Sequence, residues 1–123
     1  MTFPVEVVLR GRDFAVTESV SVPHGEPATW DDRAVRDVLV AVLRAIGRVQ
    51  DPQLPADRVV VLQGFSWIVE PLEGQVVIAL EIPAGAAVAG PFSMGQAELD
   101  QMITRVIRAE RQVTAPRTVP TIH

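Results

Sequence analysis

Two β-rich runs joined by a Pro/Gly turn decide the fold: Arg58-Val-Val-Val-Leu-Gln-Gly-Phe-Ser-Trp-Ile-Val-Glu70, then Pro71-Leu-Glu-Gly74, then Gln75-Val-Val-Ile-Ala-Leu-Glu-Ile82. Runs of this kind on either side of a turn predict a long β-hairpin. The first run is apolar on both faces, and such a strand needs cover on both sides. The remainder of the chain predicts only two helices, so we expect a partner to cover part of the sheet.

The position of the turn sets the register of this hairpin. With the turn at Pro71–Gly74, Val69 would pair with Val76. One face would then carry the large side chains and meet the helices: Phe65, Trp67, Val69, Val76, Ile78, Leu80 and Ile82. The other face would be lighter, bordered by Glu70 and Glu81, and we expect an interface there that includes Leu62, Gly64, Ser66, Ile68, Val77 and Ala79. A slip of one residue would exchange the two faces.

The segments before and after the hairpin show three further patterns. Residues 4–10 and 14–22 alternate apolar and polar side chains around a short turn, which predicts a second, amphipathic hairpin. Apolar residues at spacings of three and four predict a helix from an N-cap at Thr29 to about Gln50. The small residues of 83–92 predict a loop, which could fold over the lighter face of the long hairpin.

A second helix is predicted after that loop. Ser93 and Gln96 form a possible capping box, and an apolar stripe continues to about Arg111. The element order is then ββαββα, which predicts a two-layer α+β sandwich with a four-stranded, mostly antiparallel sheet and both helices on one face. We expect a single domain over residues 1–112 and a flexible C-terminal arm over residues 113–123.

Composition narrows the classes of function. The chain has no cysteine, which excludes disulfides and thiolate metal sites. All 11 basic side chains are arginine, as in GC-rich bacterial genomes, and the net charge is −4. Nucleic acids and anionic membranes attract clustered positive charge, so we expect neither as a partner. No apolar run approaches the ~20 residues of a membrane span, and no export signal is evident, so a cytoplasmic location is expected.

Few residues could carry catalysis, because Cys, Lys and Tyr are absent. Glu18 lies in the apolar phase of its strand, where an ionised carboxylate is costly unless paired. It is a candidate catalytic acid, or it lies at the rim beside Arg10 or Arg12. His24 is a candidate general base oriented by Glu26, a candidate metal ligand, or simply a polar turn residue. No HxH or HExxH spacing occurs, so no metal site is expected.

Two further positions are candidates for binding a ligand. Ser93 precedes a helix N-terminus behind the glycine- and alanine-rich residues 85–90, which superficially resemble a phosphate-binding loop. Glu81 borders the lighter face of the long hairpin. We expect no cofactor. The first interpretation is a non-catalytic module that forms a homodimer or docks on another protein through the sheet. The alternative is a small enzyme or ligand-binding protein whose site, between sheet and helices, uses Glu18, His24 or Glu81 with an arginine.

Overall fold

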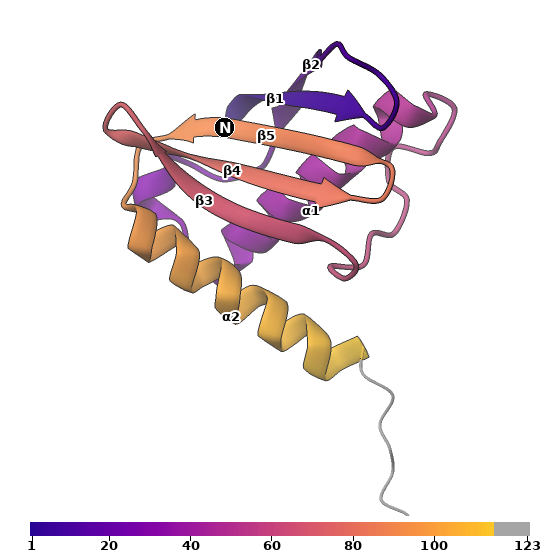
Figure 1. Cartoon of the computed structure of the whole chain (residues 1–123). Coiled ribbons are helices and arrows are strands. Elements are labelled where there is room, and N and C mark those ends of the chain that lie inside the picture. The colour runs from indigo at the N-terminus through magenta and orange to yellow at the C-terminus, as the bar shows by residue number, and fades with distance from the viewer. Residues whose placement is uncertain (115–123) are drawn as a thin grey trace, which may run out of the picture.

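A five-stranded antiparallel sheet with two helices on one side makes up residues 1–114, which are those that the computed structural model describes (Figure 1). The elements are β1 Thr2–Leu9, β2 Val16–Ser21, α1 Asp32–Gln50, β3 Ser66–Leu72, β4 Gln75–Ile82, β5 Gly85–Phe92 and α2 Gln96–Thr114. The strand order is β2-β1-β5-β4-β3, with every neighbouring pair antiparallel. The predicted α+β class is confirmed. The predicted arm lies outside the described residues, apart from the last turn of α2.

The predicted order ββαββα and the four-stranded sheet are wrong, because residues 83–92 are no loop. Strand β5 lies in the centre of the sheet, between β1 and β4, and the order is ββαβββα. Its sequence is low in β-branched residues, but backbone hydrogen bonding on both sides stabilises it whatever its side chains. Ala87 and Ala89 are fully buried on the helix side, and their small size lets α1 approach the sheet closely. Residues 85–90 therefore form no phosphate-binding loop.

The two helices lie on the same side of the sheet (Figure 1). Helix α1 packs on β1, β2 and β5, whereas α2 packs on β3 and on α1. Their apolar stripes are buried, as in Leu39 and Ile46 of α1 and Leu99 and Ile103 of α2. Between them, the helices thus cover one face of the sheet and leave the other to solvent.

The helix N-termini differ from the predicted caps. Asp31, not Thr29, caps α1, since its carboxylate accepts a 2.9 Å hydrogen bond from the Ala34 amide. Thr29 lies in a short 3-10 turn, Pro27–Thr29, and donates its hydroxyl to the Glu26 carbonyl. The Ser93–Gln96 capping box does not form, because both side chains have partners on the sheet. Gln75 donates to the Ser93 hydroxyl, and the Gln96 amide donates to the carbonyl of Val69.

The long hairpin is shorter than predicted, because β3 begins at Ser66 and residues 58–65 are irregular. Its turn has two residues, Glu73 and Gly74, whose φ angles of 49° and 82° are those of a type I′ turn. Val69 consequently pairs with Ile78, rather than with Val76. The register is shifted by two residues from the predicted one, and an even shift leaves every side chain on its predicted face.

The hairpin face that was predicted to carry the large side chains is the face that packs in the core. Four of its side chains are at most 2% exposed: Val69, Val76, Ile78 and Leu80. Phe65, Trp67 and Ile82 are half-buried against the same core. The side chains of the lighter face, from Ser66 to Glu81, point away from both helices.

Candidate functional site

The face of the sheet that bears no helix carries an aliphatic patch. Ile68, Ala79 and Val88 are cross-strand neighbours on β3, β4 and β5, so they form one row across the sheet. Ile68 is 54% exposed and Val88 is 42% exposed. Val8 of β1 lies beyond Ala86 in the next row and is 39% exposed. We call these five residues the open-face patch.

The centre of the open-face patch is hollow. Ala79 and Ala86 carry the smallest side chains there, with Ile68 on one side and Val88 on the other. The hollow has a volume of about 430 Å³ and its wall continues to Ser66. Its floor is alanine and its wall is branched aliphatic, so the lining of the hollow is mostly apolar.

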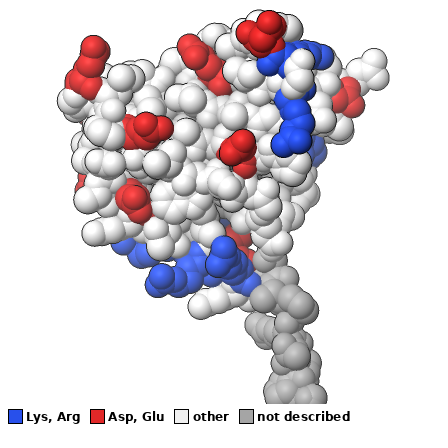
Figure 2. Space-filling view, viewed as in Figure 1, with Lys and Arg blue, Asp and Glu red and all other residues white. Residues whose placement is uncertain are grey.

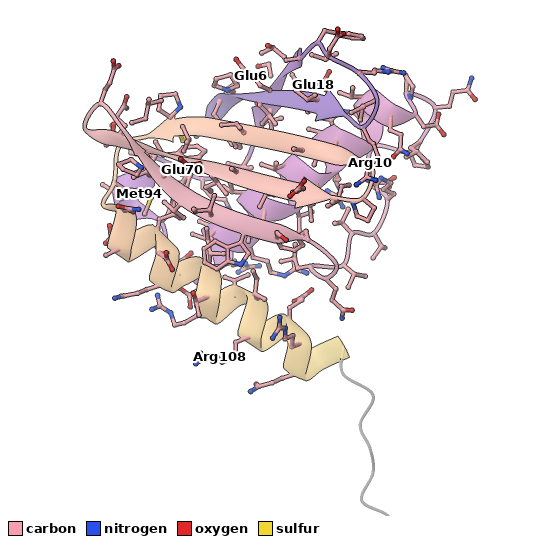
Figure 3. The ribbon with its side chains drawn as sticks, in the orientation of Figure 1. Glu6, Arg10, Glu18, Glu70, Met94 and Arg108 are labelled. Carbon is pink, nitrogen blue, oxygen red and sulfur yellow. The ribbon has the colours of Figure 1, made fainter. Side chains whose placement is uncertain are left out.

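Acidic side chains surround the open-face patch. Glu6 on β1, Glu70 on β3 and Glu81 on β4 are exposed, and none of them has an ion pair within residues 1–114. Figure 3 labels Glu6 and Glu70. Figure 2 shows the result as scattered acidic groups on a mostly uncharged face, with arginines only at its borders. Arg10, at the end of β1, is the border arginine beside the patch. The open face therefore combines an apolar centre with a negative surround.

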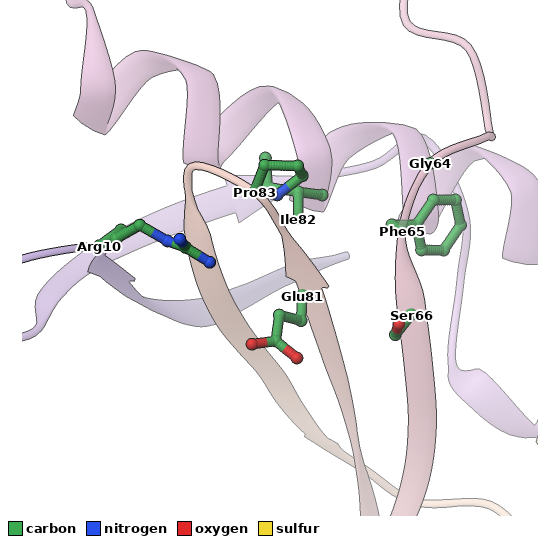
Figure 4. A pocket seen from close by; sticks show the side chains of 7 residues that line it. All are labelled: Arg10, Gly64, Phe65, Ser66, Glu81, Ile82 and Pro83. Atoms are coloured by element: carbon green, nitrogen blue, oxygen red, sulfur yellow. The ribbon is translucent and has the colours of Figure 1, made fainter.

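A second hollow adjoins the patch at the end of the sheet where β3 begins and β4 ends. It has a volume of about 460 Å³, and Arg10, Ser66 and Glu81 bring their polar groups to it (Figure 4). The Arg10 backbone amide donates a 2.8 Å hydrogen bond to the Ala84 carbonyl, which fixes this arginine against the β4–β5 turn. Across the strands, Ser66 pairs directly with Glu81. A guanidinium, a hydroxyl and a carboxylate thus share one opening.

The structure sorts the predicted interface residues into three places. Ser66, Ile68 and Ala79 line the hollow of the open-face patch, and Val77 lies on the same face one row away. Gly64 lines the second hollow. Leu62 is 1% exposed and lies in the core instead, because the irregular segment before β3 turns inward there. Whether these residues form an interface stays a prediction.

Sequence reasoning missed the contributions of β1 and β5 to this face. Val8 and Val88 belong to the patch only because β5 lies between β1 and β4. The apolar Val8 in the polar phase of its strand was an available signal. Ala86 and Val88 gave no such signal, since they fall in the segment predicted to be a loop.

Glu18 is not an isolated carboxylate in the core. It lies at the rim of the covered face, half-buried, and accepts a 3.1 Å hydrogen bond from Nε of Arg48 on α1. The predicted rim position agrees with the structure, but the partner is neither Arg10 nor Arg12. The charge of Glu18 is thus offset by an arginine, and neither hollow of the open face includes it.

His24 has a carboxylate partner, but Glu26 is not that partner. Its Nε2 lies 2.7 Å from Oδ2 of Asp37 on α1, and the histidine side chain is 22% exposed. The pair is a possible acid–base dyad in geometry alone. Among residues 1–114 no hydroxyl group is hydrogen-bonded to this pair. Glu18 pairs instead with Arg48, and Glu81 lines the second hollow, so the three predicted chemical residues lie in separate places.

Two further features are absent from residues 1–114. No group of three or more histidine, aspartate or glutamate side chains is arranged to hold a metal ion there. In the same range, neither α1 nor α2 has the uninterrupted apolar length that crossing a bilayer requires. Comparison of the chain with protein-family models, with curated proteins and with solved structures gives no match.

Proposed function

We propose that the protein is a non-catalytic interaction module that docks on a partner protein through the open-face patch. The observation that carries the proposal is the row Ile68, Ala79 and Val88, joined by Val8, on a face that neither α1 nor α2 covers within residues 1–114. Exposed apolar patches rimmed by polar residues are typical of interaction sites. The hollow between Ile68 and Val88 adds a shape that one protruding side chain can fill.

Burial of this patch would stabilise a complex appreciably. Complete burial of a valine or isoleucine side chain contributes about 1.5–3 kcal/mol. The patch side chains Val8, Ile68 and Val88 are about half exposed already, so each retains roughly 1 kcal/mol to be gained on docking. A few such residues at the centre of an interface commonly supply most of its affinity.

The charges of the open face indicate the chemistry of the partner. Glu6, Glu70 and Glu81 surround the patch, and Arg10 is the cation that lines the adjoining hollow. Two copies docked face to face would bring their glutamates together, which is unfavourable. An apolar surface fringed by arginine or lysine complements the face in both hydrophobicity and charge. We therefore assign the open face to a different protein with a basic rim.

The test is capture of the partner by the native protein from cells that express it, followed by affinity measurement on the purified pair. Ile68→Glu places a charge in the patch, and Val59→Glu is the matched control, because Val59 is 86% exposed and lies outside the patch. We expect Ile68→Glu to weaken binding at least tenfold and Val59→Glu to leave it unchanged. Added salt should also weaken the complex, since the surround is charged. Equal affinity of both variants would refute the proposal.

A second function is favoured by one specific observation, the convergence of Arg10, Ser66 and Glu81 on the second hollow. Within residues 1–114 neither charged group has an ion pair, so both are available to a ligand. A guanidinium binds carboxylates and a carboxylate binds ammonium groups. The pair therefore suits a small zwitterion, such as a free α-amino acid.

This second function is tested by NMR titration with free α-amino acids. Binding should shift the backbone amides of Ser66 and Glu81 in a saturable manner. Arg10→Gln should abolish the shifts, whereas Arg12→Gln, at a nearby exposed position, should not. Absence of shifts at about 10 mM ligand would exclude it, since even fragment-sized ligands in good sites reach millimolar affinity.

A further inference from the structure

Within residues 1–114, one row of backbone hydrogen-bonding groups on β2 pairs with no other strand. The Val22 amide donates to the Met1 carbonyl, and in an antiparallel ladder such bonded pairs recur at every second residue. The residues that bond to β1 are therefore the even-numbered ones of β2. Thr17, Ser19 and Ser21 direct their amides and carbonyls away from β1. Since β2 is the last strand of the sheet, three donors and three acceptors face outward.

The opposite edge of the sheet, formed by β3, is less accessible to an added strand than the β2 edge. The same alternation on β3 directs Trp67, Val69 and Pro71 outward, because Leu72 and Gln75 flank the two-residue turn as a bonded pair. Pro71 has no amide hydrogen to donate. The side-chain amide of Gln96 on α2 donates a 2.9 Å hydrogen bond to the Val69 carbonyl. Helix α2 also lies along this edge (Figure 1). A further strand cannot extend the sheet beyond β3 without displacing α2.

The side chains of β2 do not protect its edge. Proteins usually guard exposed edges with lysine, proline, bulges or inward-pointing charges. The outward-bonding residues of β2 carry only small hydroxyl side chains, which are exposed on the open face. Its one charged residue, Glu18, points to the covered face and is already paired with Arg48. Nothing in β2 therefore opposes an added strand.

We propose that β2 binds β2 of a second copy of this chain, antiparallel and centred on Ser19, so that the two sheets become one. In this register Ser19 pairs with its own counterpart, and Thr17 pairs with Ser21 in both directions. All six outward backbone groups are then used, and hydroxyl side chains face each other, which is a favourable cross-strand combination. A two-fold axis generates the arrangement, as expected of a closed homodimer.

The neighbouring registers are less favourable. Centring the pairing on Glu18 would place two glutamates directly opposite each other, and like charges at that position destabilise a sheet. Centring it on Val20 would bring Thr17 opposite Pro23, which has no amide hydrogen to donate. Only the register centred on Ser19 sets Glu18 against Val20 and keeps every outward group of β2 paired.

This inference does not rest on the proposed function, because the edge of β2 is separate from the open-face patch. Pairing through β2 leaves both patches uncovered and places them on the same side of the joined sheet. A dimer would therefore offer its partner two equivalent docking surfaces. The two proposals can fail independently, since Ile68→Glu alters the patch and leaves the β2 edge unchanged.

The first test measures the molar mass of the chain by sedimentation or light scattering at concentrations up to about 1 mM, which detects a dimer whose Kd is millimolar or tighter. Ser19→Pro removes an outward amide while leaving the bonds to β1 in place, and proline is tolerated on such edges. We expect the native chain and Ser19→Ala to be dimers and Ser19→Pro to be a folded monomer. A native chain that stays monomeric at the highest concentration would overturn the proposal, as would a dimeric Ser19→Pro.

The second test fixes the register and does not depend on the folding of the proline variant. The chain contains no cysteine, so a single introduced cysteine reports only on contacts between copies. Ser19→Cys should form an intermolecular disulfide rapidly, because paired residues lie about 5.5 Å apart at Cα. Thr17→Cys should form it slowly, since its counterpart is four residues away along the pairing. Equal rates, or faster cross-linking of Thr17→Cys, would overturn the pairing centred on Ser19.

Discussion

The two faces of the β3–β4 hairpin have similar residue types but different surroundings. Ile78 on the covered face is 0% exposed, whereas Ile68 on the open face is 54% exposed. The covered face has no charged residue in its centre, but the open face has glutamates around its patch. The difference teaches that hydrophobicity alone does not mark a core strand here. One set of aliphatic residues packs in the core, and the other set stays exposed on the open face.

The largest effect is expected when the same substitution is made on each face. Ile78→Ala should lower the free energy of unfolding by about 2–5 kcal/mol, because it leaves a cavity in the core. Ile68→Ala, the matched control, should change it by no more than about 0.5 kcal/mol, as at other exposed positions. Urea denaturation of both variants measures the difference. A large loss at Ile68 would mean that another part of the chain covers the open face.

The margin of the covered face can be probed at Gly47. Arg58 packs its guanidinium on this glycine, and the Arg44 side chain donates to the Arg58 carbonyl, so the segment before β3 is held against α1. A methyl group at Gly47 would overlap Nη2 of Arg58. Gly47→Ala should therefore stabilise an Arg58→Ala background by about 1 kcal/mol, the usual gain within a helix, but the native background by less.

Thermal or urea unfolding of four proteins checks the interaction: the native chain, Gly47→Ala, Arg58→Ala and the double variant. Hydrogen exchange over residues 59–65 adds a local readout, because Gly47→Ala should accelerate it in the native background. An identical gain in both backgrounds would show that Arg58 does not hold this segment.

A smaller effect is expected at the rim of the covered face, where Glu18 pairs with Arg48. Both side chains are about one-third exposed, so solvent screening limits the pair to roughly 0.5 kcal/mol. A double-mutant cycle with Glu18→Gln and Arg48→Gln should give this coupling. Glu70→Gln on the open face is the control, and should change stability by less. Marked stabilisation by Glu18→Gln would instead identify Glu18 as a strained functional carboxylate.

The smallest effect is expected from the exposed pair that joins the helices behind the sheet. A hydrogen bond from Arg105 on α2 lowers the pKa of Asp32 on α1. A carboxyl group whose pKa is lower in the folded state stabilises the fold at pH values above its pKa in the unfolded state, which is near 4. That stabilisation is lost as the pH falls through the pKa of the folded state. Asp32→Asn should therefore lower the urea midpoint slightly at neutral pH and leave it unchanged at an acidic pH below the folded pKa. Asp100→Asn, elsewhere on α2, should shift it at neither.

The sequence indicated those parts of the fold that depend on local patterns. Helices and covered strand faces follow from periodicity, and even a register error of two residues kept Trp67 and Ile78 on the covered face. Strand β5 could not be found in this way. Its alanines and glycines have little intrinsic preference for a strand, and its conformation comes from pairing with β1, which is far away in the sequence.

The candidate site was predictable only where it lies within the long hairpin. Ser66, Ile68 and Ala79 were expected on one surface because a single turn relates β3 to β4. The approach of Arg10 to Glu81 depends on the strand order, and so does the place of Val8. The partners of Glu18 and His24 both belong to α1, and packing of α1 on the sheet decides which of its charged residues reach β2 and the segment that follows it.

The central position of β5 also affects how the chain is made. Val5 pairs with Ala89, so β1 waits for a strand that is translated 84 residues later. At about 5–20 residues per second, a ribosome needs roughly 4–17 s to supply it. During that interval the β1–β2 hairpin has emerged, with one apolar face and the inner edge of β1 unpaired. Synthesis thus includes an interval in which an apolar face and a strand edge of this chain are exposed together, a condition that favours aggregation of incompletely folded chains.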